Sequence, residues 1–416
     1  MLTAITGGVL IDGLGGDPVR DAVVVIGDDR ILAAGPGRSV RVPAGARVLD
    51  AAGRTILPGF IDTHVHCTYR ARDMRQHLLN PPTYNVLKSI EILRETLACG
   101  VTTARDMGGA DAGFRQALAE GLVDGPRLMI AIGMVSQTGG HGDYWTPADL
   151  RVKKRAWLPD TVADGVDGMR RMVRELLMRG ADFIKICATG GITSVTDSWD
   201  EPQFTVEEIR VAVTEAAARG RHVAAHAEGR AGINNALRAG VHSLEHGWFI
   251  NEESIDLLLQ TGAWWTPTLA LVPLSVARRQ KDSTWAASQL GREDEKDAQI
   301  YALMQRQVPL WKEAVRRGVK VAFGTDQSHR LLVGENLVEL GFMVDWLGMS
   351  PMQAIVCATS RAAECIGMPD AGAVAPGKYA DILVVDGDPL ENIRILEERA
   401  RLHLVMKGGR PFTCAL

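Results

Sequence analysis

Residues 205–229 read TVEEIRVAVTEAAARGRHVAAHAEG, a helical pattern followed at once by a short apolar strand. Thr205, with Glu208 three positions later, is typical of the capping box that starts a helix, and the apolar run near His222 predicts a strand. The same alternation recurs through the middle of the chain. Candidate strands begin near Phe60, Val101, Leu128, Asp182, His222, His242, Ala263 and Val319. Eight such units over about 300 residues favour a distorted (β/α)8 barrel over an open, doubly wound sheet.

The two ends of the chain have a different pattern. Residues 1–57 and 368–416 alternate short β-branched runs with turns of Gly, Pro and Asp, as in AITGGVLIDG near the start. A few strands at either end cannot bury a face alone, so we expect both ends to pair into one small β-sandwich domain. The predicted organisation is therefore a barrel over 58–367 and a sandwich built from 1–57 and 368–416.

The composition excludes several classes of partner. The 46 basic and 50 acidic residues are mixed along the chain and give a net charge of −4. This leaves no basic stripe for nucleic acid or an anionic membrane, so we expect a small-molecule substrate. The six cysteines are scattered with no C-x-x-C pair, and no basic leader or run of 18 apolar residues occurs. We therefore expect a cytoplasmic protein that neither binds nor crosses a membrane.

Side chains of the type that bind metals follow several of the predicted strands. His64 and His66 end the first barrel strand, where residues i and i+2 point to the same face. On its own this pair fits an ordinary polar strand end equally well. However, His226 in VAAHAEG, His246 in SLEHG and Asp326 in VAFGTDQ end strands five, six and eight. Barrel active sites gather at these strand ends, so the pattern predicts a metal site.

Lys185 is the odd residue of the apolar stretch ADFIKICATGG, residues 181–191. A lysine is rarely buried without a partner, and a protonated lysine would be repelled by a nearby cation. Burial and a neighbouring cation both depress a lysine pKa and leave a neutral amine. We expect carbon dioxide to convert this amine to a carbamate whose two oxygens bridge two metals. The alternatives are a tip that reaches the barrel rim, or a salt bridge to Asp182 or Asp106.

These residues, in this order, resemble the amidohydrolase superfamily with a binuclear centre and a carboxylated lysine. The flanking phrases LPGFIDTHVH, TGGHGD, HAEG, LEHG, FGTD and GKYADILVVDGDP are similar to its branch of Xaa-Pro dipeptidases, imidazolonepropionase-like proteins and ochratoxin-degrading amidohydrolases. The resemblance covers essentially the whole chain. It also implies a homo-oligomer, because relatives often assemble into larger oligomers.

The resemblance implies a role for each ligand. His64, His66 and Asp326 would hold one divalent cation, and His226 and His246 the other, with Lys185 between them. Zinc suits this ligand set, and manganese or iron also fits. A hydroxide held between two cations is nucleophilic at neutral pH, and one cation can polarise the scissile carbonyl. Asp326 would take the proton from the hydroxide and deliver it to the leaving nitrogen.

Three long strand-to-helix loops, predicted over 136–160, 189–204 and 269–292, are expected to build the substrate pocket. His141 would donate a hydrogen bond to the developing oxyanion, and Arg230 would bind a substrate carboxylate. Alternatively, His141 only organises its own loop and Arg230 is an exposed helix residue. Aromatic pocket residues, or simple packing residues, would be Tyr144, Trp145, Trp199 and Trp264.

The spacing around His226 argues against a deaminase. Mononuclear deaminases of the superfamily usually carry H-x-x-E after strand five and lack the strand-four lysine, whereas here Glu228 gives H-x-E. Glu245, next to His246 in a regular strand, should point away from the barrel interior and pack or support the site. His222 and His242 open their strands far from the barrel mouth, and we interpret them as structural.

The sequence therefore predicts a metal-dependent hydrolase of an amide bond in a dipeptide or N-acyl amino acid, including ochratoxin-like amides. The first alternative is a hydrolase of a cyclic amide, a urea or a carbamate. The second is a scaffold of the same fold that has lost the reaction. Such descendants typically lose ligands, whereas all six predicted ligand positions are retained here.

Overall fold

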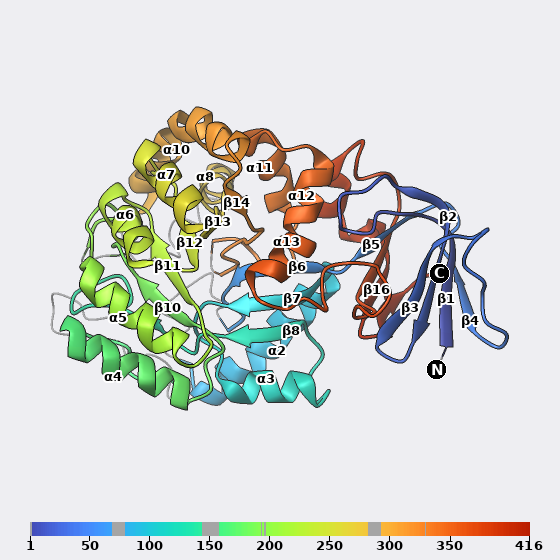
Figure 1. The fold of residues 1–416 in the computed structure, drawn as a ribbon, viewed down its shortest axis with the longest axis horizontal. Coiled ribbons are helices and arrows are strands. Elements are labelled where there is room, and N and C mark those ends of the chain that lie inside the picture. The colour runs from blue at the N-terminus through green and yellow to red at the C-terminus, as the bar shows by residue number, and fades with distance from the viewer. Residues whose placement is uncertain are drawn as a thin grey trace.

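Strands and helices alternate through the middle of the chain (Figure 1). The structure is a computed structural model that describes residues 2–68, 80–143, 158–192, 194, 197–281, 293–328 and 330–416. Within these ranges the central strands are β6 (Phe60–Val65), β7 (Val101–Asp106), β8 (Arg127–Ile130), β9 (Met134–Val135), β10 (Ile184–Cys187), β11 (Val223–Ala227), β12 (Ser243–His246), β13 (Trp264–Thr266) and β14 (Lys320–Val321). A strand lies at each of the eight predicted positions, with β8 and β9 forming the third.

The helices lie around the outside of these strands (Figure 1). Those described are α2 (Pro82–Ala98), α3 (Ala112–Ala119), α4 (Gly165–Met178), α5 (Val206–Ala217), α6 (Arg230–Ala239), α7 (Glu252–Thr261), α8 (Leu271–Lys281), α10 (Glu293–Arg316), α11 (Val338–Leu347), α12 (Pro351–Cys357) and α13 (Ser360–Cys365). Helix α5 begins with the predicted capping box of Thr205 and Glu208. Helix α12 begins in the same way at Ser350, with Pro351 in its first turn.

Two parallel sheets make up the barrel wall among the described residues, in the orders β6-β7-β8 and β14-β13-β12-β11-β10-β9. Backbone hydrogen bonds cross both gaps between them. The Asp182 N–H donates to Ile130 O at 2.8 Å, and the Thr63 N–H donates to Phe323 O at 3.0 Å. The third strand is broken between β8 and β9, where Ile132 has a φ of 70°. This break accounts for the distortion, and the distorted (β/α)8 barrel is confirmed.

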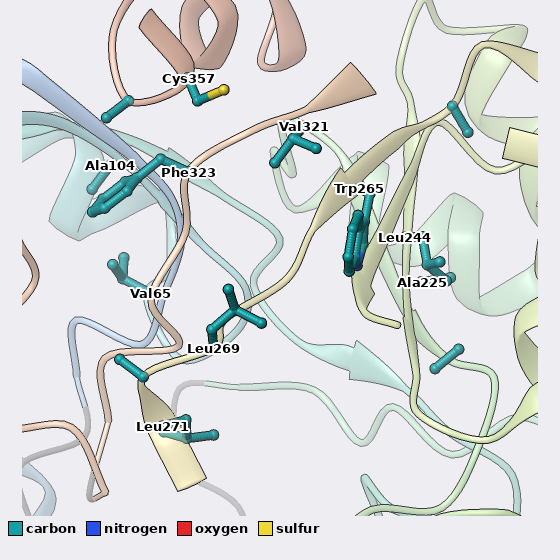
Figure 2. Packing of buried hydrophobic residues seen from close by; sticks show 14 of the residues in the cluster. Val65, Ala104, Ala225, Leu244, Trp265, Leu269, Leu271, Val321, Phe323 and Cys357 are labelled. Carbon is teal, nitrogen blue, oxygen red and sulfur yellow. The ribbon is translucent and has the colours of Figure 1, made fainter. Parts of the chain in front are cut away.

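The barrel wall is apolar on both faces, as expected for parallel strands covered by helices. Figure 2 shows part of the resulting core, to which different strands contribute Val65, Ala104, Ala225, Leu244, Trp265 and Val321. Trp265 and Phe323 are fully buried. Burying one such side chain stabilises the fold by about 1.5–3 kcal/mol, so the large common core holds the strand ends in fixed positions.

The two chain ends form a second unit beside the barrel, and both termini lie at it (Figure 1). Its strands, among the described residues, are β1 (Leu2–Leu10), β2 (Val19–Gly27), β3 (Arg30–Pro36), β4 (Arg47–Asp50), β5 (Thr55–Pro58), β15 (Ile382–Val385), β16 (Leu402–Lys407) and β17 (Arg410–Cys414). The expected sandwich takes the form of one continuous sheet in the order β17-β16-β15-β5-β1-β2-β3, with β4 paired to β1. The segment boundaries 1–57, 58–367 and 368–416 remain a proposal.

Two arginines and a tyrosine join this sheet to the barrel. The guanidinium carbons of Arg30 and Arg127 each lie 4.0 Å from the centroid of the Tyr379 ring. Arg127, on barrel strand β8, also donates to the buried Asp381 carboxylate at 2.8 Å. These contacts orient the barrel strands relative to the sheet.

One predicted loop is wrong. The stretch 269–292 contains helix α8 over Leu271–Lys281, and residues 282–292 lie outside the described ranges. The Glu339 carboxylate accepts the Leu269 and Ala270 N–H groups, both at 2.7 Å, and so satisfies donors at the start of this helix. The sequence pattern did not predict helix α8, because the Glu339 carboxylate that caps it lies far away along the chain.

Among the helices that the structure describes, none combines the length and the apolar character needed to cross a bilayer.

Candidate metal centre

His64 and His66 point to one side of β6, as the i, i+2 spacing predicted. Asp326, just after β14, places Oδ1 3.6 Å from His64 Nε2 and 3.3 Å from His66 Nε2. One ligand atom from each of these three residues lies within 4.8 Å of the other two. Two imidazole nitrogens and a carboxylate at this spacing are a donor set for a borderline divalent cation.

The other two predicted imidazoles lie beside this cluster. The centroid of the His246 ring is 4.9 Å from that of His64 and 4.7 Å from that of His226. His226 ends β11 and His246 ends β12, and the two strands are neighbours in the sheet. The structure therefore brings together side chains from four strand ends that are far apart in the sequence.

Each of the four rings has one nitrogen bound to an outer partner. The pairs are His64 Nδ1 with Glu245 Oε2 at 2.8 Å, His66 Nδ1 with Gly108 O at 2.9 Å, His226 Nε2 with Gly190 O at 3.0 Å, and His246 Nδ1 with Thr268 Oγ1 at 2.8 Å. A carbonyl oxygen only accepts, so the ring nitrogen facing it carries the proton and the opposite nitrogen keeps its lone pair. Such outer hydrogen bonds orient histidines that bind metals.

Two of the predicted ligands have unusual backbone conformations. His246 has a φ of 67° and Asp326 a φ of 53°. Residues other than glycine rarely adopt this left-handed region, and the cost is of order 1–3 kcal/mol each. At both positions the chain leaves the strand alternation, so the side chain turns into the barrel mouth. Conformational strain at ligand positions is typical of a functional site.

Lys185 lies on β10 and is 1% exposed. Within the described part of the chain its Nζ has no hydrogen-bond partner. Burial lowers the pKa of this amine. Neither predicted salt bridge forms: the Asp182 carboxylate binds Arg115 at 2.5 Å, and the Asp106 carboxylate accepts the Cys67 N–H at 2.8 Å. Nor does the tip reach the rim, so the alternatives for Lys185 are wrong.

The protonation states of His64 and Asp326 suit a bound cation, whereas His66 would have to lose a proton to it: burial alone would lower the pKa of His66, but the Asp326 carboxylate raises it overall. Burial, followed by the positive charge of Lys185, holds the pKa of His64 well below its usual range. Burial alone would raise the pKa of Asp326, but the hydrogen bond from His66 and the neighbouring positive charges lower it overall. A neutral imidazole beside an ionised carboxylate is the protonation state that a cation requires. The residues present therefore fit a divalent cation.

Glu245 corrects one expectation. It does not point away from the interior: its carboxylate is fully buried, binds His64 across the barrel and accepts Arg105 Nη2 at 2.9 Å. Strand alternation misplaced it because the left-handed conformation of His246 ends the regular pattern one residue later. The expected supporting role agrees with this contact.

His141 reaches the cluster from the loop after β9. Its ring stacks on that of His226 with centroids 4.3 Å apart, and its Nδ1 lies 2.7 Å from Ser194 Oγ. A Cβ at Gly191 would lie 2.3 Å from both Cε1 and Nδ1 of His141, so only glycine permits this approach. His141 therefore does more than organise its own loop.

The remaining pocket predictions have mixed outcomes. Tyr144 and Trp145 lie outside the described residues. Trp199 packs on Phe249, with ring centroids 4.2 Å apart. For Trp264 the packing alternative holds: it opens β13, at the end of the strand away from the metal ligands, and packs with Ala322 and Cys365. Arg230 is exposed at the first position of α6.

Sequence reasoning missed Arg105 and Thr268. Arg105 is a charged residue inside the apolar strand β7, and the argument applied to Lys185 would have found it. Thr268 has a φ of 48° and offers its hydroxyl to His246. No local pattern marks it, because its role depends on a turn held by the distant Glu339.

The whole chain is similar to several known proteins. A model described as the amidohydrolase family matches residues 55–412. Ochratoxinase from Aspergillus niger is 31% identical over 99% of this chain and 86% of its own length. A prolidase solved with N-methylphosphonate-L-proline superposes with a TM-score of 0.90 at 33% identity, covering 100% of both chains. A Xaa-Pro dipeptidase with bound methionine gives a TM-score of 0.87 at 30% identity, covering 99% of this chain and 100% of that one.

Proposed function

The chain belongs to the amidohydrolase family and is a hydrolytic enzyme of C–N bonds, and we propose that its substrate is a dipeptide or N-acyl amino acid with a free carboxylate. The support is the set of similar proteins, whose names refer to ochratoxin, to Xaa-Pro dipeptides and to proline substrates. An ochratoxin-like amide is one member of this class.

We propose the ligand assignment that the family resemblance implies, supported by the clustering of His64, His66 and Asp326. His64, His66 and Asp326 hold one divalent cation, and His226 and His246 hold the second. Zinc is the proposed metal, because mixed imidazole and carboxylate donors suit it. When bound, the cations supply Lewis acidity for the scissile carbonyl and lower the pKa of a water molecule.

Lys185 is the proposed bridge. Its neutral amine forms an N–C bond with carbon dioxide and releases one proton to water, so the product is a carbamate with one negative charge. This change turns a buried and unpartnered amine into an anionic ligand with two oxygens. The orphaned and buried Nζ, whose charge acts on His64, His226 and His246, is the single observation that carries the proposal.

Asp326 is the proposed proton carrier. Its lowered pKa keeps it ionised at neutral pH, so it can accept a proton from the attacking water. It then delivers this proton to the leaving nitrogen, because an amine leaves poorly without one.

His141 is proposed to donate a hydrogen bond to the carbonyl oxygen as negative charge develops there. Its stacking on His226, a proposed metal ligand, supports this role. Arg230 and Tyr144 are proposed to bind the substrate, with Arg230 pairing with its carboxylate. We also propose that the protein is cytoplasmic, assembles into a homo-oligomer, and binds neither nucleic acid nor membranes.

A substrate panel tests the proposed reaction. N-acyl amino acids and Xaa-Pro dipeptides should be cleaved, with activity lost on chelation and restored by zinc. Lactams, ureas and carbamates should be poor substrates; the reverse order of preference would favour the runner-up, a hydrolase of cyclic amides, ureas or carbamates. Retention of full activity in the demetallated protein would overturn the proposed metal centre.

A further inference from the structure

The four imidazoles of the proposed centre differ in the charge of their outer partners. Gly108 and Gly190 offer backbone carbonyls, and Thr268 offers a hydroxyl. His64 instead pairs at 2.8 Å with a carboxylate, that of Glu245, whereas the Glu228 carboxylate oxygen beside His226 Nε2 is 3.8 Å away, beyond hydrogen-bond distance. The two halves of the centre are therefore supported unequally.

The Glu245 carboxylate is fixed on both sides. Oε1 accepts Arg105 Nη2 at 2.9 Å and Ser243 Oγ at 2.5 Å, which leaves Oε2 for His64. Arg105 is itself held in place, because its Nε donates to Thr63 O at 2.7 Å. Arg105, His64 and Glu245 are all at most 3% exposed, so water does not screen these contacts.

We propose that Glu245 is a positioning residue that makes the His64–His66–Asp326 site the tighter of the two cation sites. This inference rests on the proposed two-cation centre. A carboxylate that accepts the Nδ1–H of His64 polarises the ring and makes Nε2 a stronger donor. It also prevents the ring from rotating away when the site is empty.

His246 provides the internal comparison. Its Nδ1 faces the Thr268 hydroxyl at the same 2.8 Å, so the geometry is matched and the negative charge is missing. A neutral hydroxyl orients the ring but polarises it less. The site that contains His246 should therefore fill second.

Stepwise titration of the metal-free protein with Co²⁺ tests the inference. In the wild type we expect two binding phases, and His66→Asn should remove the tighter one. Glu245→Gln keeps the shape of the side chain but loses its charge, so the tighter phase should weaken by roughly 10- to 100-fold while the weaker phase is unchanged. The matched control Thr268→Val should weaken only the second phase.

The outcomes separate the inference from the proposed function. Two phases of unchanged affinity in Glu245→Gln, or weakening of the second phase alone, would overturn the role of Glu245 and leave the metal centre standing. A wild-type protein that binds no Co²⁺ would overturn both. If Glu245→Gln does not fold, Ser243→Ala, which removes one hydrogen bond to the same carboxylate, must still weaken the tighter phase. Unchanged binding in that variant would contradict the inference.

Discussion

The imidazole of His141 lies flat on that of His226, with ring centroids 4.3 Å apart and 11° between the ring planes. His141 comes from the loop after β9 and His226 from strand β11, and further contacts fix the ring of His141. Its Nδ1 lies 2.7 Å from Ser194 Oγ, and its backbone N–H donates to Gln203 Oε1 at 3.1 Å. A loop histidine is thus held against a proposed metal ligand before substrate arrives.

Gly191→Ala should displace His141 and leave the metal centre intact. The new Cβ would lie 2.3 Å from the ring, so the ring must move. Moving a catalytic group by about 1 Å can lower the rate by up to about 100-fold. We therefore expect kcat/KM of Gly191→Ala to fall by about 10- to 100-fold, with the metal content unchanged. Gly16→Ala, where a Cβ meets nothing within 4 Å, is the matched control. Wild-type kinetics in Gly191→Ala would show that His141 plays no part in catalysis.

Lys185→Met should lower the activity and raise the stability of the metal-free protein. Activity should fall by about 1000-fold, because the bridging ligand supplies several kcal/mol through the cations. The free energy of unfolding of the metal-free variant should nevertheless be about 1–3 kcal/mol higher than that of the metal-free wild type, since a buried amine without a partner is removed. Urea denaturation in the presence of a chelator measures this difference. A variant less stable than the wild type would imply that Nζ is satisfied in the resting protein.

Acid should destabilise the protein through His242. Burial lowers the pKa of His242 from 6.5 to about 4, while its Nε2 faces Cys365 O at 2.7 Å. Because the unfolded chain binds this proton more readily, the stabilising contribution is complete above pH 6.5 and is lost as the pH falls towards 4. The loss is about 3 kcal/mol. His242→Gln should flatten the profile of unfolding free energy over this window, and an equally steep profile would refute the assignment.

Metal removal should lower thermal stability as well as activity. Cations bind only the folded arrangement of ligands, so a free metal concentration 100 times Kd adds about 2.7 kcal/mol. The melting temperature should therefore fall on chelation and recover when zinc is returned. In His66→Asn the shift should be smaller, because one ligand is missing. An identical melting temperature with and without chelator would argue against bound cations.

The ligand positions could be predicted because barrel chemistry gathers at strand ends. His64, His66, His226, His246 and Asp326 each follow an apolar strand, and their residue types are informative without any tertiary contact. Lys185 stood out because its charge conflicts with the surrounding apolar pattern. The eight strands were found for the same reason, since helical and strand periodicities differ clearly in this chain.

The supporting residues could not be predicted in the same way. Glu245 was assigned to the wrong side because its position depends on the left-handed conformation of the next residue. Residue type alone left Trp264 as either a pocket or a packing residue, and its place at the opposite end of its strand makes it a packing residue. Helix α8 was missed because Glu339, which binds its first N–H groups, lies some 70 residues away. Each of these depends on a contact between distant segments.

Diffraction from zinc-loaded crystals at the zinc absorption edge would locate the cations themselves. We expect two anomalous peaks, one in contact with His64, His66 and Asp326, the other with His226 and His246. Density for one carbon and two oxygens should extend beyond Lys185 Nζ and touch both metals. A single peak, or a plain amine at Lys185 beside two peaks, would contradict the bridged two-cation centre.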